Sequence, residues 1–295
     1  MATTKKTTKP MKLAAKPATS LTSGKRALQI ATDKAKSTEE RLTALAQSPS
    51  ALVGDDESLE SVLAILRDVK EPAKLRMAAM NSLQAASFSV VTFRSCQNDY
   101  RLALRKVAQD GNPELRQRAL GLLARQKDPF AQKRLLEGLQ DSTKALVPPE
   151  QALQLLSYDA HAGAYQAARA IVDQPTNPET KTAALRLLAT DTNSVPLFEK
   201  VLLDKNELRQ NRQVSASALH ALDPEKMQAL ARNIVLDTGD YDDIKATSLT
   251  ALTEFGDEST LSEDKTLWQG VNRLKTKGSP KLKLSAIQFL SKTGQ

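Results

Sequence analysis

A leucine recurs along this chain at intervals that suit one pair of helices. These anchor leucines are Leu83, Leu123, Leu156, Leu188, Leu219, Leu252 and Leu290, with spacings of 40, 33, 32, 31, 33 and 38 residues. A fixed period of about 20–50 residues marks a repeat protein, whose units must stack on one another to bury their apolar faces. We therefore expect one repeat array with a continuous core rather than two ordinary domains.

Three further positions recur with the anchor leucines. Four residues earlier lies a small residue, one helical turn away on the same face, which lets a neighbouring helix approach closely. These residues are Ala79, Ala119, Ala152, Ala184, Ser215, Ser248 and Ala286. Seven residues before the anchor, six of the seven copies carry a basic residue: Arg76, Arg116, Lys181, Arg212, Lys245 and Lys283, with Pro149 in the other copy. Fifteen residues before it, five copies carry an aspartate: Asp68, Asp141, Asp173, Asp204 and Asp237.

Each copy is interpreted as two helices, an A helix that ends near the aspartate and a B helix that follows a short turn. Proline opens the B helix at Pro72, Pro113 and Pro178, where its missing N–H costs nothing. Helix formers dominate the composition, and aromatic residues make up only 4% of it. We expect helices over 24–36, 38–47, 57–69, 72–86, 90–109, 113–126, 129–140, 149–158, 162–174, 178–190, 194–204, 207–221, 224–237, 242–254, 263–277 and 280–292.

The proline or aspartate before the B helix, the basic residue within it and the Ala-x-x-x-Leu face together resemble the short HEAT repeats of many bacterial proteins. The resemblance covers residues 38–292. It implies an all-α fold, an α-α superhelix (α-solenoid) of about seven to eight HEAT-like helical hairpins. We assign residues 24–295 to this solenoid. Residues 1–23, rich in Lys and Thr and without helical periodicity, are expected to be a disordered basic arm.

The recurring aspartates and basic residues are expected to form a structural ladder along one ridge of the stack. An Asp at the turn between the two helices can accept hydrogen bonds from helix N-termini, and the basic residue can bridge to its own or the adjacent repeat. We favour this ladder over a charged binding groove. Its members are Asp68, Arg76, Arg116, Asp173, Lys181, Asp204, Arg212, Asp237 and Lys245.

The residues that enzymes most often use are scarce. The chain has two histidines, His161 and His220, in different repeats, and one cysteine, Cys96. It contains no His-Glu-x-x-His, Cys-x-x-Cys, Gly-x-Ser-x-Gly or Gly-rich phosphate loop. We therefore predict no catalytic, cofactor-binding or metal-binding residues, and a protein that is not an enzyme. HEAT-like arrays do occur among phycobilin lyases and alkylpurine DNA glycosylases, but the pocket residues of those families do not map onto this chain.

Positive charge and aromatic residues mark one stretch of the array as a partner-binding surface. Residues 101–134 hold nine basic residues against three acidic ones, and the longest repeat spacing lies here. Insertions in solenoids often shape a binding face. The expected partner-binding residues are Arg101, Arg105, Arg118, Arg125, Arg134, Phe88 and Phe93, with a solvated helix face or a core position as the alternative for each.

The net charge of +8 belongs to the N-terminal region, because residues 1–36 hold nine basic residues and one acidic one. We predict a non-enzymatic scaffold or adaptor that binds a protein partner on a concave face made mainly of B helices. The alternative is a nucleic-acid binder that uses the basic arm and the stretch from Arg101 to Arg134. The sequence shows neither a secretory signal nor an apolar run long enough to span a membrane, so a cytoplasmic location is expected. A transit peptide within residues 1–36 stays open.

Overall fold

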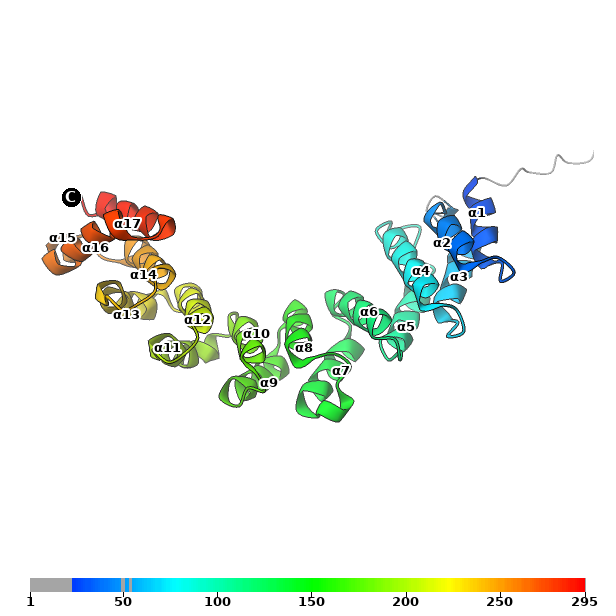
Figure 1. Ribbon diagram of the computed structural model, residues 1–295, viewed down its shortest axis with the longest axis horizontal. Helices are drawn as coiled ribbons and strands as arrows, with labels where there is room; N and C mark the ends of the chain where they lie inside the picture. The colour runs from blue at the N-terminus through cyan, green and yellow to red at the C-terminus, as the bar shows by residue number, and fades with distance from the viewer. Residues whose placement is uncertain (1–22, 49–50, 53–54, 295) are drawn as a thin grey trace, which may run out of the picture. The chain divides into compact units, whose positions relative to one another are not determined.

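The computed structural model describes residues 23–48, 51–52 and 55–294. Within these ranges every regular element is a helix, and successive helices form hairpins joined by short turns (Figure 1). The prediction of an all-α solenoid of HEAT-like hairpins is confirmed. The predicted basic arm lies outside the described residues, except for Ser23, which begins the first helix.

The chain forms two compact units, residues 1–106 and 107–295. The described part of the first unit holds two hairpins and one further helix: α1 (Ser23–Thr32), α2 (Thr38–Ala46), α3 (Asp56–Arg67), α4 (Ala73–Ala86) and α5 (Gln97–Val107). Within it, α1 packs against α2 and α3, and α4 packs against α2 and α3.

The second unit begins with a B helix and continues through five hairpins. Its α-helices are α6 (Pro113–Arg125), α7 (Pro129–Gln140), α8 (Pro149–Leu156), α9 (Ala162–Asp173), α10 (Pro178–Leu188), α11 (Val195–Leu203), α12 (Arg209–Leu222), α13 (Pro224–Leu236), α14 (Asp242–Phe255), α15 (Glu258–Glu263), α16 (Lys265–Lys277) and α17 (Pro280–Lys292). Three short 3-10 helices accompany them: η2 (Ser142–Lys144), η3 (Ser157–Asp159) and η4 (Thr192–Ser194). The B helices α6, α8, α10, α12, α14 and α17 pack one after another in a row (Figure 1).

The packed face of each B helix is the one that the Ala-x-x-x-Leu spacing predicted. All seven anchor leucines and all seven small residues that precede them are buried, with no more than 5% of any of them exposed. Burying a leucine side chain stabilises a fold by about 1.5–3 kcal/mol, so the repeated leucine supplies a comparable share of the core in every repeat. The small residue keeps the neighbouring helix close enough to complete that burial.

Side-chain caps start several of the helices. Asn112 and Asn177 accept hydrogen bonds from the backbone N–H groups of Leu115 and Thr180, at 3.0 and 2.7 Å, and so cap α6 and α10. Proline follows at the first turn in both helices. These caps satisfy N–H groups that have no partner within the helix, which fixes where each B helix begins.

Two elements differ from the sequence-based expectation. The helix expected over 90–109 is shorter, because residues 90–96 form turns and α5 begins only at Gln97. Val90, Val91 and Thr92 are consecutive β-branched residues, which lose side-chain freedom in a helix. A short helix, α15, precedes the last hairpin where only a turn was expected, and Asp257 caps it by accepting a hydrogen bond from the Thr260 N–H at 2.8 Å.

Candidate protein-binding groove

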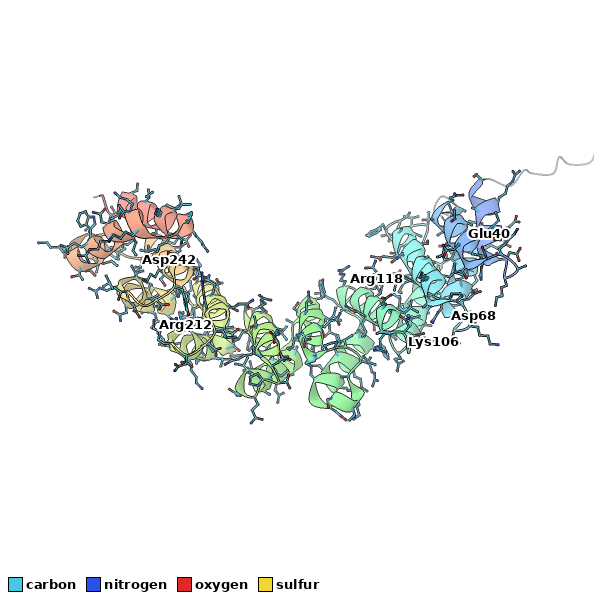
Figure 2. All side chains as sticks on the ribbon, in the orientation of Figure 1. Glu40, Asp68, Lys106, Arg118, Arg212 and Asp242 are labelled. Atoms are coloured by element: carbon cyan, nitrogen blue, oxygen red, sulfur yellow. The ribbon has the colours of Figure 1, made fainter. Side chains whose placement is uncertain are left out.

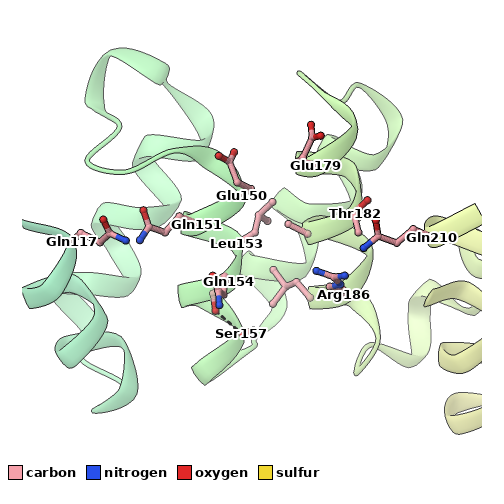
Figure 3. A pocket seen from close by; sticks show the side chains of 12 residues that line it. Gln117, Glu150, Gln151, Leu153, Gln154, Ser157, Glu179, Thr182, Arg186 and Gln210 are labelled. Carbon is pink, nitrogen blue, oxygen red and sulfur yellow. Dashed lines mark hydrogen bonds between the residues drawn. The ribbon is translucent and has the colours of Figure 1, made fainter. Parts of the chain in front are cut away.

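The B helices of the second unit line a groove of about 620 Å³. Helices α6, α8, α10 and α12 supply its side chains, together with the first residue of η3 (Figure 3). The lining residues are Gln117, Glu150, Gln151, Leu153, Gln154, Ser157, Glu179, Thr182, Ala183, Arg186, Leu187 and Gln210. The groove therefore runs across several repeats instead of lying within one of them.

Four of the side chains that line this groove are glutamines. Gln117 and Gln151 face each other from α6 and α8, and Gln154 and Gln210 line the same groove (Figure 3). Each amide offers two N–H donors and a carbonyl acceptor. Among the described residues, none of these four side chains has a hydrogen-bond partner. Their donors and acceptors are thus free to bind a ligand.

The two edges of the groove carry opposite charges. Glu150 and Glu179 lie along one edge, in the first turns of α8 and α10, and Arg186 lies toward the other edge in the last turn of α10 (Figure 3). Acidic residues at helix N-termini and basic residues at C-termini complement the helix dipole, which accounts for this placement. Because the B helices lie side by side in the same direction, the same preference polarises the groove.

A second hollow of about 360 Å³ adjoins the groove along α6 and α8 and shares three of its glutamines. The Arg125 guanidinium lies 5.6 Å from the centre of the Tyr158 ring, and its Nε is 3.4 Å from the Tyr158 hydroxyl. Arg118 and Glu114 of α6 also line this hollow. The hollow enlarges the polar B-helix face along α6 and α8 and adds an aromatic ring to it.

The predicted partner-binding arginines do not all lie on this face. Arg118, labelled in Figure 2, and Arg125 line the second hollow. Arg134 lies on α7, an A helix, and pairs with Glu137 at 2.6 Å. Arg101 and Arg105 lie on α5 in the first unit, where Arg101 donates to the Asn98 side chain.

The two predicted partner-binding aromatic residues have different environments. Phe88 is 81% exposed in the segment that follows α4. Phe93 is 3% exposed and meets the Tyr100 ring edge-on, with 5.6 Å between the ring centres. The Phe93 ring therefore belongs to the core of the first unit, and its assignment to a binding surface is corrected, because a buried ring has no area left for a partner.

The basic residue of the ladder occupies the fourth position of its B helix and reaches back to its own A helix. The Nε atoms of Arg41, Arg76 and Arg212 donate to backbone carbonyls ten residues earlier, near the end of the A helix, at 2.9, 3.1 and 2.8 Å. A cation at this point satisfies a carbonyl that has no partner within the helix, and it complements the helix dipole. The arginine thus holds the two helices of one hairpin together.

The terminal nitrogens of two of these arginines reach the next repeat. Arg41 bonds to both carboxylate oxygens of Glu71 at 2.8 Å, and Arg212 bonds to those of Asp240 at 2.9 and 2.8 Å. Lys181 pairs with one carboxylate oxygen of Glu207, which also lies in the next repeat. The hydrogen bonds that Arg41 donates to the Glu71 carboxylate raise the pKa of Arg41. Burial alone would raise the pKa of Asp240, but the hydrogen bonds from Arg212 and Lys205 lower it.

Lysines in the turns between helices bind the ladder aspartates of the next repeat. Lys34 reaches Asp68 at 2.7 Å, and Lys205 reaches Asp237 at 2.7 Å. The remaining ladder members have other surroundings: Arg116 donates to the Leu146 and Asp110 carbonyls, Asp204 accepts from the Asn206 N–H, Asp173 is exposed, and Lys245 is buried.

Sequence reasoning missed the acceptors Glu71, Glu207 and Asp240. Each lies five residues before the basic residue of its own repeat, so the carboxylate and the cation that bind one another come from different repeats. The recurrence of an acid at this position in three copies was the signal that could have identified them. The predicted ladder considered only the aspartates at the ends of the A helices.

The histidines and the cysteine do not form a cluster. His161 Nδ1 lies 2.8 Å from the Asp159 carbonyl, and His220 Nε2 lies 3.1 Å from Glu254. Burial raises the pKa of the Cys96 thiol to about 11. The described residues contain no group of three or more His, Cys, Asp or Glu side chains that could hold a metal ion, and none of their helices is long and apolar enough to cross a membrane.

Comparisons with known proteins give matches only among solved structures. No family model and no curated protein matches the chain. The chain is similar to the complex of CpcE and CpcF of phycocyanin lyase from Nostoc sp. PCC7120, with 17% identity and a TM-score of 0.40 over 90% of this chain and 98% of that one. It is also similar to human deoxyhypusine hydroxylase in complex with glycerol, with 13% identity and a TM-score of 0.35 over 81% of this chain and 96% of that one. At these values the likeness concerns the helical-solenoid fold and transfers neither substrates nor residues.

The prediction that this chain is not an enzyme is contradicted by these matches. Both similar structures are of proteins named as enzymes, a lyase and a hydroxylase. The prediction rested on missing sequence motifs, and carboxylates acquire catalytic roles through geometry that no short motif records. We therefore withdraw the exclusion.

Proposed function

We propose that this chain is a HEAT-like repeat protein that binds an extended segment of a protein partner in the B-helix groove of its second unit. The observation that carries this proposal is the set of four glutamine amides without a partner, which lie between an acidic edge and Arg186. An extended backbone presents alternating N–H and C=O groups, and a side-chain amide can pair with both. The charged edges then discriminate among side chains of the ligand.

The dimensions of the groove suit such a segment. Neighbouring helices in a row lie roughly 8–10 Å apart, and an extended chain rises about 3.3 Å per residue. Each repeat would then meet about three residues of the ligand, so the four helices that line the groove would bind roughly a dozen. A phosphate backbone would instead meet Glu150 and Glu179, which disfavours nucleic acid at this site.

Site-specific cross-linking tests the proposal. A photoreactive amino acid replaces Gln154 in the groove, and in a matched variant it replaces Lys200, which is exposed on the A helix α11. We expect a defined protein to cross-link at position 154, both after nuclease treatment and in a chain that lacks residues 1–22. Equal cross-linking at position 200, or loss of the product on nuclease treatment, would overturn the proposal.

Charge reversal in the groove provides an independent readout. Replacing Arg186 by Glu makes the basic edge acidic, and we expect the cross-linked product at position 154 to fall about tenfold, which corresponds to 1.4 kcal/mol of binding free energy. The matched change is Lys200→Glu, which alters the net charge equally without touching the groove. An equal loss in both variants would mean that only overall charge matters.

A further inference from the structure

One position of the B helices fills the junction with the next repeat. Three residues before the anchor leucine, the side chains of α6, α8, α10, α12 and α14 are all fully buried: Leu120, Leu153, Leu185, Ala216 and Leu249. In α17, the last helix that the structure describes, this position is Ile287, which is 50% exposed. The described chain therefore leaves the outer face of α17 uncovered.

A second apolar side chain extends this face. Leu284 lies one turn before Ile287 on the same side of α17 and is 57% exposed. Single exposed apolar residues are ordinary on protein surfaces. Leu284 and Ile287 are instead adjacent, and the position of Ile287 is buried in every preceding repeat of this unit. Together they form an apolar patch that no described residue covers.

Positive charge surrounds this apolar pair. Residues 265–292 contain seven basic residues and no acidic one. Arg273, Lys275, Lys277 and Lys281 are exposed and Lys283 is half-buried, around the turn between α16 and α17. The described part of the chain provides none of these five with an ion-pair partner. In earlier repeats the corresponding turns carry Asp68 or Asp237, so the last turn reverses the charge of the ridge.

Lys283 indicates that, among the described residues, the outer face of α17 lacks a carboxylate partner. It is the fourth residue of α17, the position from which Arg41, Lys181 and Arg212 bind a carboxylate in the turn of the next repeat. The outer face of α17 therefore carries a cation and apolar side chains of the kind that contact the next repeat elsewhere in the chain. A complementary surface would provide carboxylates beside aliphatic side chains.

We propose that the outer face of α17 is a docking surface for an acidic amphipathic helix of a protein partner. The apolar side chains of that helix would cover Leu284 and Ile287, and its carboxylates would pair with Lys283 and the lysines around the turn. A second copy of this chain fits less well, because its first hairpin carries Lys36 at the position where three other turns carry the acceptor carboxylates Glu71, Glu207 and Asp240. Nucleic acid would use the lysines but gain nothing from the two aliphatic side chains. This surface is separate from the groove of the proposed function.

Fluorescence anisotropy with synthetic probes tests this docking surface. The first probe is a labelled amphipathic helical peptide with leucines on one face and glutamates beside them, and the second is the same peptide with glutamine for each glutamate. The third probe is a labelled single-stranded oligonucleotide of equal charge. The full chain is compared with the variants Leu284→Ser/Ile287→Ser and Lys281→Glu/Lys283→Glu, with Lys200→Glu as the control and circular dichroism to verify folding.

We expect the full chain to bind the acidic peptide at least about tenfold more tightly than the glutamine peptide, and each double substitution to weaken binding by a similar factor. The Lys200→Glu variant should bind like the unchanged protein. No measurable binding of the acidic peptide overturns the proposal. Equal binding by the serine variant also overturns it, since charge alone would then suffice. Tighter binding of the oligonucleotide, unaffected by the serine substitutions, assigns the surface to nucleic acid instead.

Discussion

Two junctions of the second unit are held together by different means. Between α12 and α14, the buried Arg212 binds both carboxylate oxygens of Asp240 and reaches back to its own A helix. Between α8 and α10, Pro149 and Thr176 occupy the equivalent positions, so that junction has no such ion pair. The groove lies over this uncharged junction and extends as far as α12, where Lys181 and Glu207 pair. This difference suggests two roles for the junctions. A buried ion pair holds one repeat in a fixed position against the next, whereas the uncharged junction leaves glutamine side chains available to a ligand.

The first unit repeats the charged arrangement. Lys34, Arg41, Asp68 and Glu71 occupy the same positions as Lys205, Arg212, Asp237 and Asp240, and they make corresponding contacts. A pair of basic residues from one repeat thus meets a pair of acidic residues from the next in both units. Its recurrence indicates that this ion-pair arrangement belongs to the repeat itself, and the α8–α10 junction lacks it because Pro149 and Thr176 occupy the two positions.

Replacing Arg212 by Met should produce the largest effect on stability. The substitution removes the buried guanidinium and leaves Lys205 as the remaining cationic partner of the buried Asp240. Loss of one member of a buried pair costs about 3–5 kcal/mol. Urea unfolding followed by circular dichroism measures the change. The matched control is Arg209→Met in the same helix, because Arg209 is exposed and makes only surface contacts, a pair with Asp243 at 3.2 Å and a stack on the Tyr241 ring at 5.1 Å. We expect that control to cost less than about 1 kcal/mol. Equal losses in the two variants would show that burial of the pair is unimportant.

The repeat face could be predicted from sequence, whereas the partners across repeats could not. Leucines such as Leu123 and small residues such as Ala119 share one helical face by spacing alone, and helix periodicity is a local property. The pair of Arg212 and Asp240 depends on which turn stacks beside which helix, a relation that no spacing within one repeat contains. The sequence analysis expected a partner-binding face made mainly of B helices, but it could not name the residues that line the groove, since Gln117 and Gln210 come from repeats far apart in the sequence.

A substitution where α7 closely approaches the turn that follows it should destabilise the chain by less than Arg212→Met does. A methyl group added at Gly138 would lie 2.9 Å from the backbone Cα of Ala145, so one of the two must move. Gly138→Ala should therefore destabilise the chain by about 1–3 kcal/mol. Gly121→Ala is the matched control on the neighbouring B helix, where the added methyl meets nothing within 4 Å. That change should stabilise by about 0.5–1 kcal/mol through helix propensity, and urea midpoints that move in the same direction would contradict this account.

The charged junction should also respond to pH. The pKa of Asp240 is lowered in the folded chain, so its contribution to stability is fully present above the ordinary aspartate pKa near 3.8 and is lost as the pH falls through the lower folded value. The difference in unfolding midpoint between the unchanged protein and Asp240→Asn should be greatest at neutral pH and shrink under acid conditions. Asp173→Asn, at an exposed position, should show little difference at any pH. A gap for Asp240→Asn that stays constant on acidification would exclude this linkage.

The groove should show the smallest effect on stability and a large effect on binding. Gln151 and Gln154 make no side-chain hydrogen bond to the described residues, so replacing both by Ala should change the free energy of unfolding by less than about 0.5 kcal/mol. With a photoreactive residue at Gln210, the same double substitution should reduce the cross-linked product about tenfold, because the ligand loses two amide partners. A stability loss comparable to that of Arg212→Met would mean that the glutamines hold the middle repeats together. The uncharged junction would then be a structural variant of the ladder and not a binding site.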